Sequence, residues 1–65
     1  MITGNMFKRY VDISCKILHI YSHDTIIEIL DFMSSDEAVL KMEEILSTNP
    51  TEDELLEKIH ELQEN

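Results

Sequence analysis

Hydrophobic residues recur along this chain at the spacing of amphipathic helices, in four segments separated by polar residues. In residues 35–47 the apolar positions form a narrow stripe, and in residues 24–33 they cover more than half of the helix circumference. The clearest stripe lies in residues 51–63 and consists of Leu55, Leu56, Ile59 and Leu62. The pattern predicts an all-α fold, a compact bundle of four short helices.

The first segment fits either a strand or a helix. Apolar and polar residues alternate over 11–17, as in a strand, but the alternation fails at Leu18. A helix over about 6–22 instead gathers the polar residues within one arc of about 100°. These residues are Lys8, Arg9, Asp12, Lys16, His19 and His23. We therefore favour the helix. A strand followed by two helices, as in ribbon-helix-helix DNA-binding proteins, would need basic residues where Asp12 and Ser14 stand.

Capping residues divide the chain further. Ser34 with Glu37 fits a capping box, and Ser22 or Asp24 can cap the preceding helix. Asn49-Pro50-Thr51 provides a cap, a proline in the first turn and a second box from Thr51 to Glu54. Residues 1–5 have no periodicity. We expect them to form a flexible tail before a single helical domain at 6–65.

The first two predicted helices are apolar around more than half of their circumference. Each therefore needs neighbours on more than one side, and a homodimer would supply them and enlarge the small core of a 65-residue chain. Leu40 is a further contact candidate because it stands on an otherwise charged face. The predicted dimer or contact residues are Phe7, Tyr10, Ile17, Tyr21, Phe32 and Leu40.

Composition excludes several classes of protein. The only glycine precedes the helical segments, so glycine-rich phosphate-binding loops are absent. One cysteine cannot form an internal disulfide or a cysteine-rich zinc site. The longest strictly apolar run, Ala38-Val39-Leu40, is far too short to span a membrane, and the apolar stretch near the N-terminus is interrupted by polar residues. We expect a cytoplasmic protein with no membrane partner.

The net charge of −9 is divided unevenly along the chain. Residues 1–23 hold three cations and one acid, or +2, whereas residues 24–65 hold 13 acids and two lysines, or −11. This balance disfavours direct nucleic-acid binding, which depends on Lys and Arg, and favours a protein partner with a basic surface. The predicted partner-binding residues are Asp36, Glu37, Glu43, Glu44, Asp53, Glu57, Glu61 and Glu64.

The sequence offers little chemistry beyond charge. Cys15, His19 and His23 follow at intervals of four residues, but about 12 Å of helix separates the first from the last, so they cannot share one metal ion. His19 and His23 match the spacing of zinc-protease ligands, yet the glutamate that should follow the first histidine is Ile20. His60 has acidic neighbours one turn away on either side. We predict no metal, no cofactor and no enzymatic activity.

Two functional hypotheses follow. The first is a stoichiometric regulator or inhibitor that docks its acidic helices on a basic surface of a larger protein. An antirepressor that imitates DNA phosphates would be one regulator of this kind. The alternative is a structural subunit that docks into an assembly through the apolar excess of the first two helices.

Overall fold

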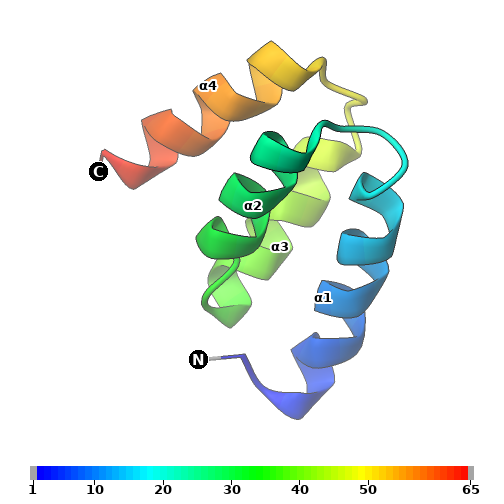
Figure 1. Cartoon of the computed structure of the whole chain (residues 1–65). Coiled ribbons are helices and arrows are strands. Elements are labelled where there is room, and N and C mark those ends of the chain that lie inside the picture. The colour runs from blue at the N-terminus through cyan, green and yellow to red at the C-terminus, as the bar shows by residue number, and fades with distance from the viewer. Residues whose placement is uncertain (1, 65) are drawn as a thin grey trace.

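A computed structural model describes residues 2–64 as four helices: α1 (Gly4–Ile17), α2 (His23–Phe32), α3 (Asp36–Leu46) and α4 (Glu52–Gln63). Figure 1 shows α1 and α2 side by side in opposite directions, with α3 behind them and α4 next to α2. The Cα radius of gyration is 10.9 Å, close to the value of about 11 Å expected for one domain of this length. The predicted all-α bundle is confirmed.

α1 begins earlier and ends earlier than predicted. Its first turn starts at Gly4 because the Thr3 carbonyl accepts the Phe7 N–H at 2.9 Å, and Asp36 of α3 accepts the Thr3 N–H at 2.8 Å. Gly4 and Asn5, which lie within the expected tail, thus belong to the first turn of α1, and Met1 lies outside the described residues. α1 ends at Ile17 rather than near residue 22, and a turn at 18–20 leads into α2.

Long-range contacts hold the chain in this turn after α1. The Tyr21 hydroxyl donates to the Pro50 carbonyl at 2.9 Å, and the Ser22 N–H donates to Glu52 Oε1 at 2.6 Å. Both acceptors belong to the segment that enters α4. An uninterrupted helix through residue 22 would lose these bonds. They join the α1–α2 connection to the α3–α4 connection.

The helix starts agree with the predicted caps in part. The box at α4 is confirmed: Thr51 Oγ1 accepts the Glu54 N–H at 3.2 Å, and Glu54 accepts the Thr51 N–H at 2.9 Å. Ser22 is the N-cap residue of α2, without a side-chain cap bond. At α3 the prediction was wrong by one residue, because Ser35, not Ser34, accepts the Ala38 N–H. Pro50 precedes the α4 cap rather than standing in its first turn.

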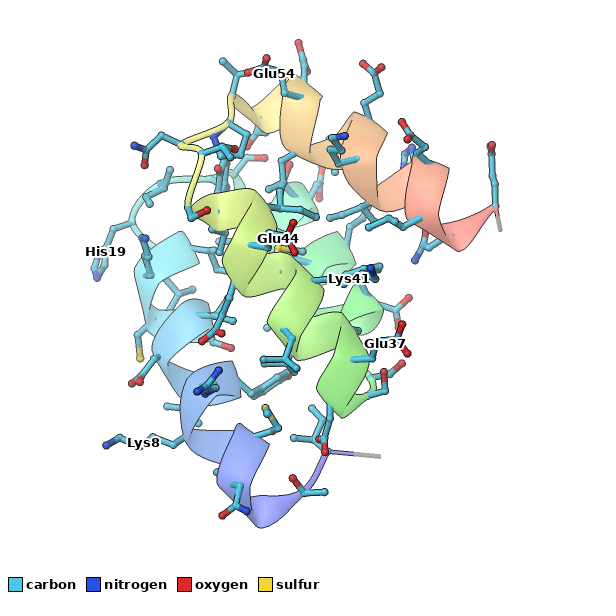
Figure 2. The ribbon with its side chains drawn as sticks, turned by 180° about the vertical axis from the view of Figure 1, so that it is seen from behind. Lys8, His19, Glu37, Lys41, Glu44 and Glu54 are labelled. Atoms are coloured by element: carbon cyan, nitrogen blue, oxygen red, sulfur yellow. The ribbon has the colours of Figure 1, made fainter. Side chains whose placement is uncertain are left out.

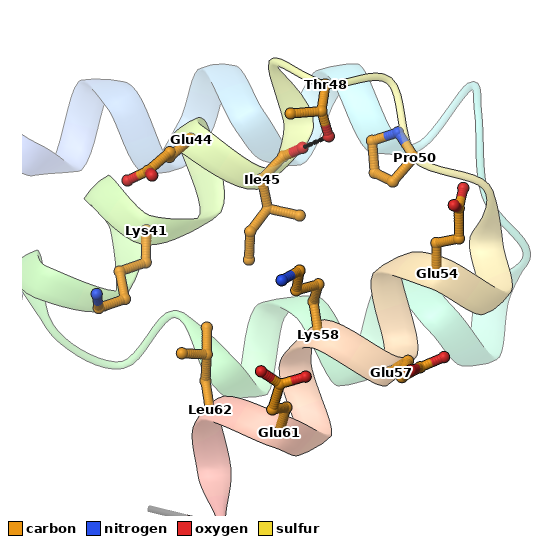
Figure 3. A pocket seen from close by; sticks show the side chains of 10 residues that line it. All are labelled: Lys41, Glu44, Ile45, Thr48, Pro50, Glu54, Glu57, Lys58, Glu61 and Leu62. Atoms are coloured by element: carbon orange, nitrogen blue, oxygen red, sulfur yellow. Dashed lines mark hydrogen bonds between the residues drawn. The ribbon is translucent and has the colours of Figure 1, made fainter.

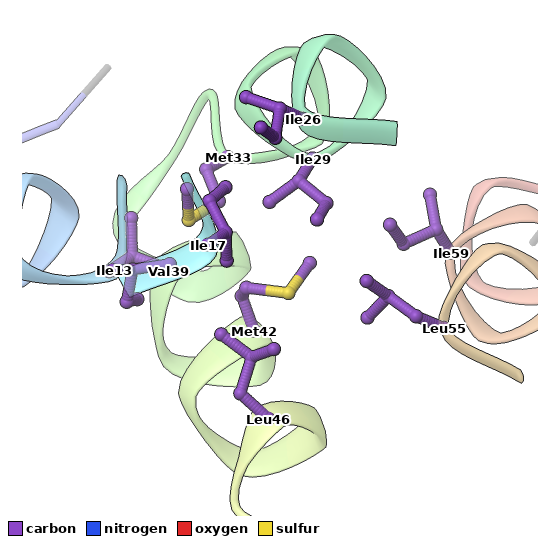
Figure 4. Packing of buried hydrophobic residues seen from close by; sticks show 10 residues of the cluster. All are labelled: Ile13, Ile17, Ile26, Ile29, Met33, Val39, Met42, Leu46, Leu55 and Ile59. Atoms are coloured by element: carbon purple, nitrogen blue, oxygen red, sulfur yellow. The ribbon is translucent and has the colours of Figure 1, made fainter. Parts of the chain in front are cut away.

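The core takes apolar side chains from all four helices and from the residue after α2. Met42 of α3 lies at its centre, between Ile17 and Ile29 on one side and Leu55 of α4 on the other (Figure 4). Thr25 is the buried polar side chain among the described residues, and its hydroxyl accepts a bond from Ser22 Oγ at 3.3 Å. Among residues 2–64 the buried apolar residues are Ile13, Ile17, Ile26, Ile29, Met33, Val39, Met42, Leu46, Leu55 and Ile59.

Candidate functional site at the α3–α4 face

A groove of about 660 Å³ separates α3 from α4 (Figure 3). It has an apolar part, formed by half-buried side chains, and a charged rim supplied by both helices. The apolar part consists of Ile45, Pro50 and Leu62, and the rim of Lys41, Glu44, Thr48, Glu54, Glu57, Lys58 and Glu61.

The connection between α3 and α4 positions the two walls. α3 stops at Leu46, the Thr48 hydroxyl donates to the Ile45 carbonyl at 2.7 Å, and Asn49 adopts a left-handed φ of 52°. Asparagine tolerates this conformation better than most residues, which lets the chain reverse. The Thr51–Glu54 box then starts α4 at an angle to α3, as Figure 2 shows, so that the helices do not close over the groove.

Three of the eight predicted partner-binding acids line this groove: Glu44, Glu57 and Glu61. Glu37 on α3, Asp53 on α4 and Glu64 just after α4 are exposed and do not line it. Glu54 lines the groove and was not among the predicted residues, although its place three positions after Thr51 marked it as a cap.

Two of the predicted acids are engaged inside the fold. Glu43 Oε1 lies 3.0 Å from Arg9 Nη1, an ion pair that joins α3 to α1. Asp36 accepts the Thr3 N–H at the start of α1. Of the two contacts, the Arg9–Glu43 pair joins opposite charges, so one positive and one negative charge are balanced within the molecule.

Backbone donors hold two further carboxylates in the charged form. The Ser22 N–H is the main cause that lowers the pKa of Glu52, and Thr25 adds a smaller contribution through its hydroxyl. The Thr51 N–H likewise lowers the pKa of Glu54. Because each carboxylate accepts bonds that only its ionised form accepts fully, both remain negative well into the acidic range. Glu54 thus gives the groove a fixed negative charge near Pro50.

Lys41 and Lys58 make the groove a mixed surface rather than a purely acidic one. Figure 3 shows Lys58 between the two walls and Lys41 toward the open end. The two lysines face four glutamates, which leaves the rim at −2. Over the full length of α3 and α4, nine acids stand against the same two lysines, which gives −7.

The predicted dimer or contact residues occupy different environments. Ile17 is fully buried, so it was wrong as a surface contact. Tyr10, Tyr21 and Phe32 are partly buried and pack against the core. Phe7 and Leu40 are exposed, on α1 and α3 respectively.

The histidines and the cysteine form no cluster. Cys15, His19 and His23 are all exposed. Within residues 2–64, no three His, Cys, Asp or Glu side chains are grouped closely enough to hold a metal ion. His60 pairs across the bundle with Glu28 of α2, at 3.2 Å, rather than with its neighbours on α4. In the same described part of the chain, no helix has the length and apolar character needed to cross a membrane.

Comparison with known proteins adds no assignment. Neither a family profile, nor a curated protein, nor a solved structure matches this chain.

Proposed function

We propose that this protein acts by binding, and that its α3–α4 face receives a basic segment of another protein. The observation that carries the proposal is the groove between these helices, in which the half-buried Ile45 and Leu62 lie between glutamates of both helices. Apolar side chains of a partner would contact Ile45 and Leu62, and its Lys or Arg residues would pair with the glutamates beside them.

The mixed rim suits the binding of a basic peptide better than the imitation of a DNA phosphate backbone. Asp36 and Glu43 are engaged with α1, which shortens the carboxylate row that an imitation of a DNA backbone would present. Lys41 and Lys58 interrupt the row again. A partner helix with one apolar and one basic face fits this arrangement better than a uniformly basic DNA-binding groove does.

The test uses a fluorescent amphipathic helical peptide, basic on one face and leucine-rich on the other. Its affinity should fall about tenfold when NaCl is raised from about 0.05 M to about 0.5 M, because salt screens the glutamates. The double variant Glu44→Gln with Glu57→Gln should weaken binding at low salt by a similar factor.

The control removes the same charge outside the groove. Glu37→Gln with Glu64→Gln gives the same net charge of −7 and should retain most of the affinity. Equal losses in the two double variants would show that only net charge matters, and an affinity that does not respond to salt would remove the electrostatic argument. Either result contradicts the proposed site.

A second candidate function is supported by exposed apolar residues on the other side of the molecule. Phe7, Leu18 and Ile27 are exposed on α1, the turn after it and α2. A structural subunit that docks through them would be poorly soluble or partly unfolded when purified alone. A regulator would be soluble and cooperatively folded.

A further inference from the structure

The outer surface of α1 carries an apolar stripe that the fold leaves uncovered. Phe7, Val11 and Leu18 are 58%, 39% and 60% exposed. They follow at intervals of four and seven residues, so they share one face of the helix and its C-terminal turn. A row of this kind differs from the scattered exposed residues that are normal on protein surfaces.

This stripe points away from α3. On a helix of about 100° per residue, Phe7 and Val11 both lie about 160° around α1 from Arg9. Arg9 is the residue that reaches Glu43 of α3. The stripe is therefore on the opposite side of α1, facing out of the bundle.

α2 contributes an equivalent apolar position. Ile27 is 52% exposed and lies about 160° around the helix from the buried Thr25. Because α1 packs beside α2, Ile27 and the α1 stripe belong to one surface, the outside of the α1–α2 layer in Figure 1. We call this surface the α1–α2 face.

The two edges of the α1–α2 face carry opposite charge. Beyond the stripe, on the outer side of α1, lies Lys8, which points away from the bundle in Figure 2; Lys16 and Asp12 are farther round. Beyond Ile27, on the outer side of α2, lie Asp24 and Asp31. Since the helices run in opposite directions, Lys8 and Asp31 are at the same end of the layer.

We propose that a second copy of this chain covers the α1–α2 face, related by a two-fold axis parallel to the two helices. That rotation places α1 of each copy over α2 of the other and keeps positions along the helices level. The basic edge of one copy then meets the acidic edge of the second, with Lys8 opposite Asp31 on both edges of the interface, at the same end of the helices. A two-fold axis perpendicular to the helices would bring like edges together.

The apolar centre and the charged edges thus fit a copy of the same surface. Phe7, Val11 and Leu18 would pack against Ile27 of the second copy, which removes the apolar stripe from water. The groove between α3 and α4 is on the far side and stays open, so this dimer does not depend on the proposed peptide binding.

Sedimentation equilibrium of the full chain from about 5 µM to about 1 mM tests the proposal. The expected mass at high concentration is twice 7.6 kDa. Val11→Glu should raise the dimer dissociation constant by about a hundredfold, because it buries a charge without a partner. Leu40→Glu on α3 is the matched control: Leu40 is 42% exposed, like Val11, and should have no effect.

Charge reversal tests the axis. Lys8→Glu and Asp31→Lys should each weaken the dimer by up to about tenfold, and the double variant should restore it. A monomer at every concentration, or equal dissociation by Leu40→Glu, would overturn the dimer at this face. A double variant no tighter than its parents would overturn the axis. Circular dichroism of each variant verifies that helicity is unchanged. Val11→Glu should still bind the peptide, which separates this proposal from the α3–α4 site.

Discussion

Tyr21 offers the sharpest test of how the bundle is closed. Its hydroxyl donates to the Pro50 carbonyl at 2.9 Å and so links the α1–α2 connection to the α3–α4 connection. Next to it, the Ser22 N–H reaches Glu52. Tyr21→Phe removes the hydroxyl, leaves the ring in place against the core, and strands a partly buried carbonyl.

The expected cost is about 1 kcal/mol, the usual net value of a neutral hydrogen bond, because water can partly replace the lost donor at this half-buried site. A 65-residue domain has a free energy of unfolding of about 3–10 kcal/mol. One bond therefore accounts for about a tenth to a third of the stability, and the midpoint of thermal unfolding should fall by about 4–8 °C.

Urea unfolding followed by circular dichroism measures the effect, with Tyr10→Phe as the control. Tyr10 stacks on Phe7 with ring centroids 6.2 Å apart, a contact that phenylalanine preserves. The control should change the free energy of unfolding by less than about 0.5 kcal/mol. Equal stabilities for the two variants would refute the link between the connections.

Tyr21→Phe should also differ from the wild type in how stability depends on alkaline pH. Burial, and secondarily the charge of Glu52, raises the pKa of Tyr21 above its usual 10.0. The fold thus favours the neutral phenol, and this contribution is complete below pH 10.0 and lost as the pH rises through the folded value. The wild type should approach Tyr21→Phe in stability above pH 10.0; a constant difference across that range would contradict the assignment.

Two other perturbations probe the core and the acid response. Met42→Ala at the fully buried centre should lower the free energy of unfolding in urea by about 2–5 kcal/mol. Leu40→Ala, two residues away and exposed, should change it by less than about 0.5 kcal/mol. Similar losses in the two variants would place the core elsewhere. Because the Ser22 N–H lowers the pKa of Glu52, the stabilisation by this carboxylate is present above pH 4.5 and lost as the pH falls through the lower folded value. Glu52→Gln should therefore flatten the decline in stability below pH 4.5. Parallel pH profiles of the variant and the wild type would contradict this.

Local signals predicted most of the helices, while distant contacts set the first boundary. The Thr51–Glu54 box spans four residues and was predictable from the sequence alone. The end of α1 was not, because Tyr21 and Ser22 are held by Pro50 and Glu52, which lie 29 and 30 residues further along the chain. Apolar periodicity continues past Ile17, so a helical pattern by itself gives no reason to stop there.

The candidate site shows the same limit. Glu43 and Glu44 are adjacent and chemically identical, yet one pairs with Arg9 and the other lines the groove, because α1 and α4 lie on different sides of α3. Ile17 and Leu18 differ in the same way, one buried and one exposed. Composition predicted how much charge and apolar surface the chain carries, but only helix packing decides which residues present it.

The two proposed surfaces answer to salt differently, and this follows from where the fold puts its charge. Two chains of −9 each would repel strongly if their glutamates faced one another. The dimer places α3 and α4 on opposite outer sides, and each molecule is 20 Å across its shortest dimension, more than twice the screening length of about 8 Å at physiological salt. The proposed dimer combines an apolar centre with exposed charged edges, so it should weaken less with salt than peptide binding at the groove does. A single salt titration that follows both mass and peptide affinity separates the two surfaces, because coupled changes would mean that one surface serves both purposes.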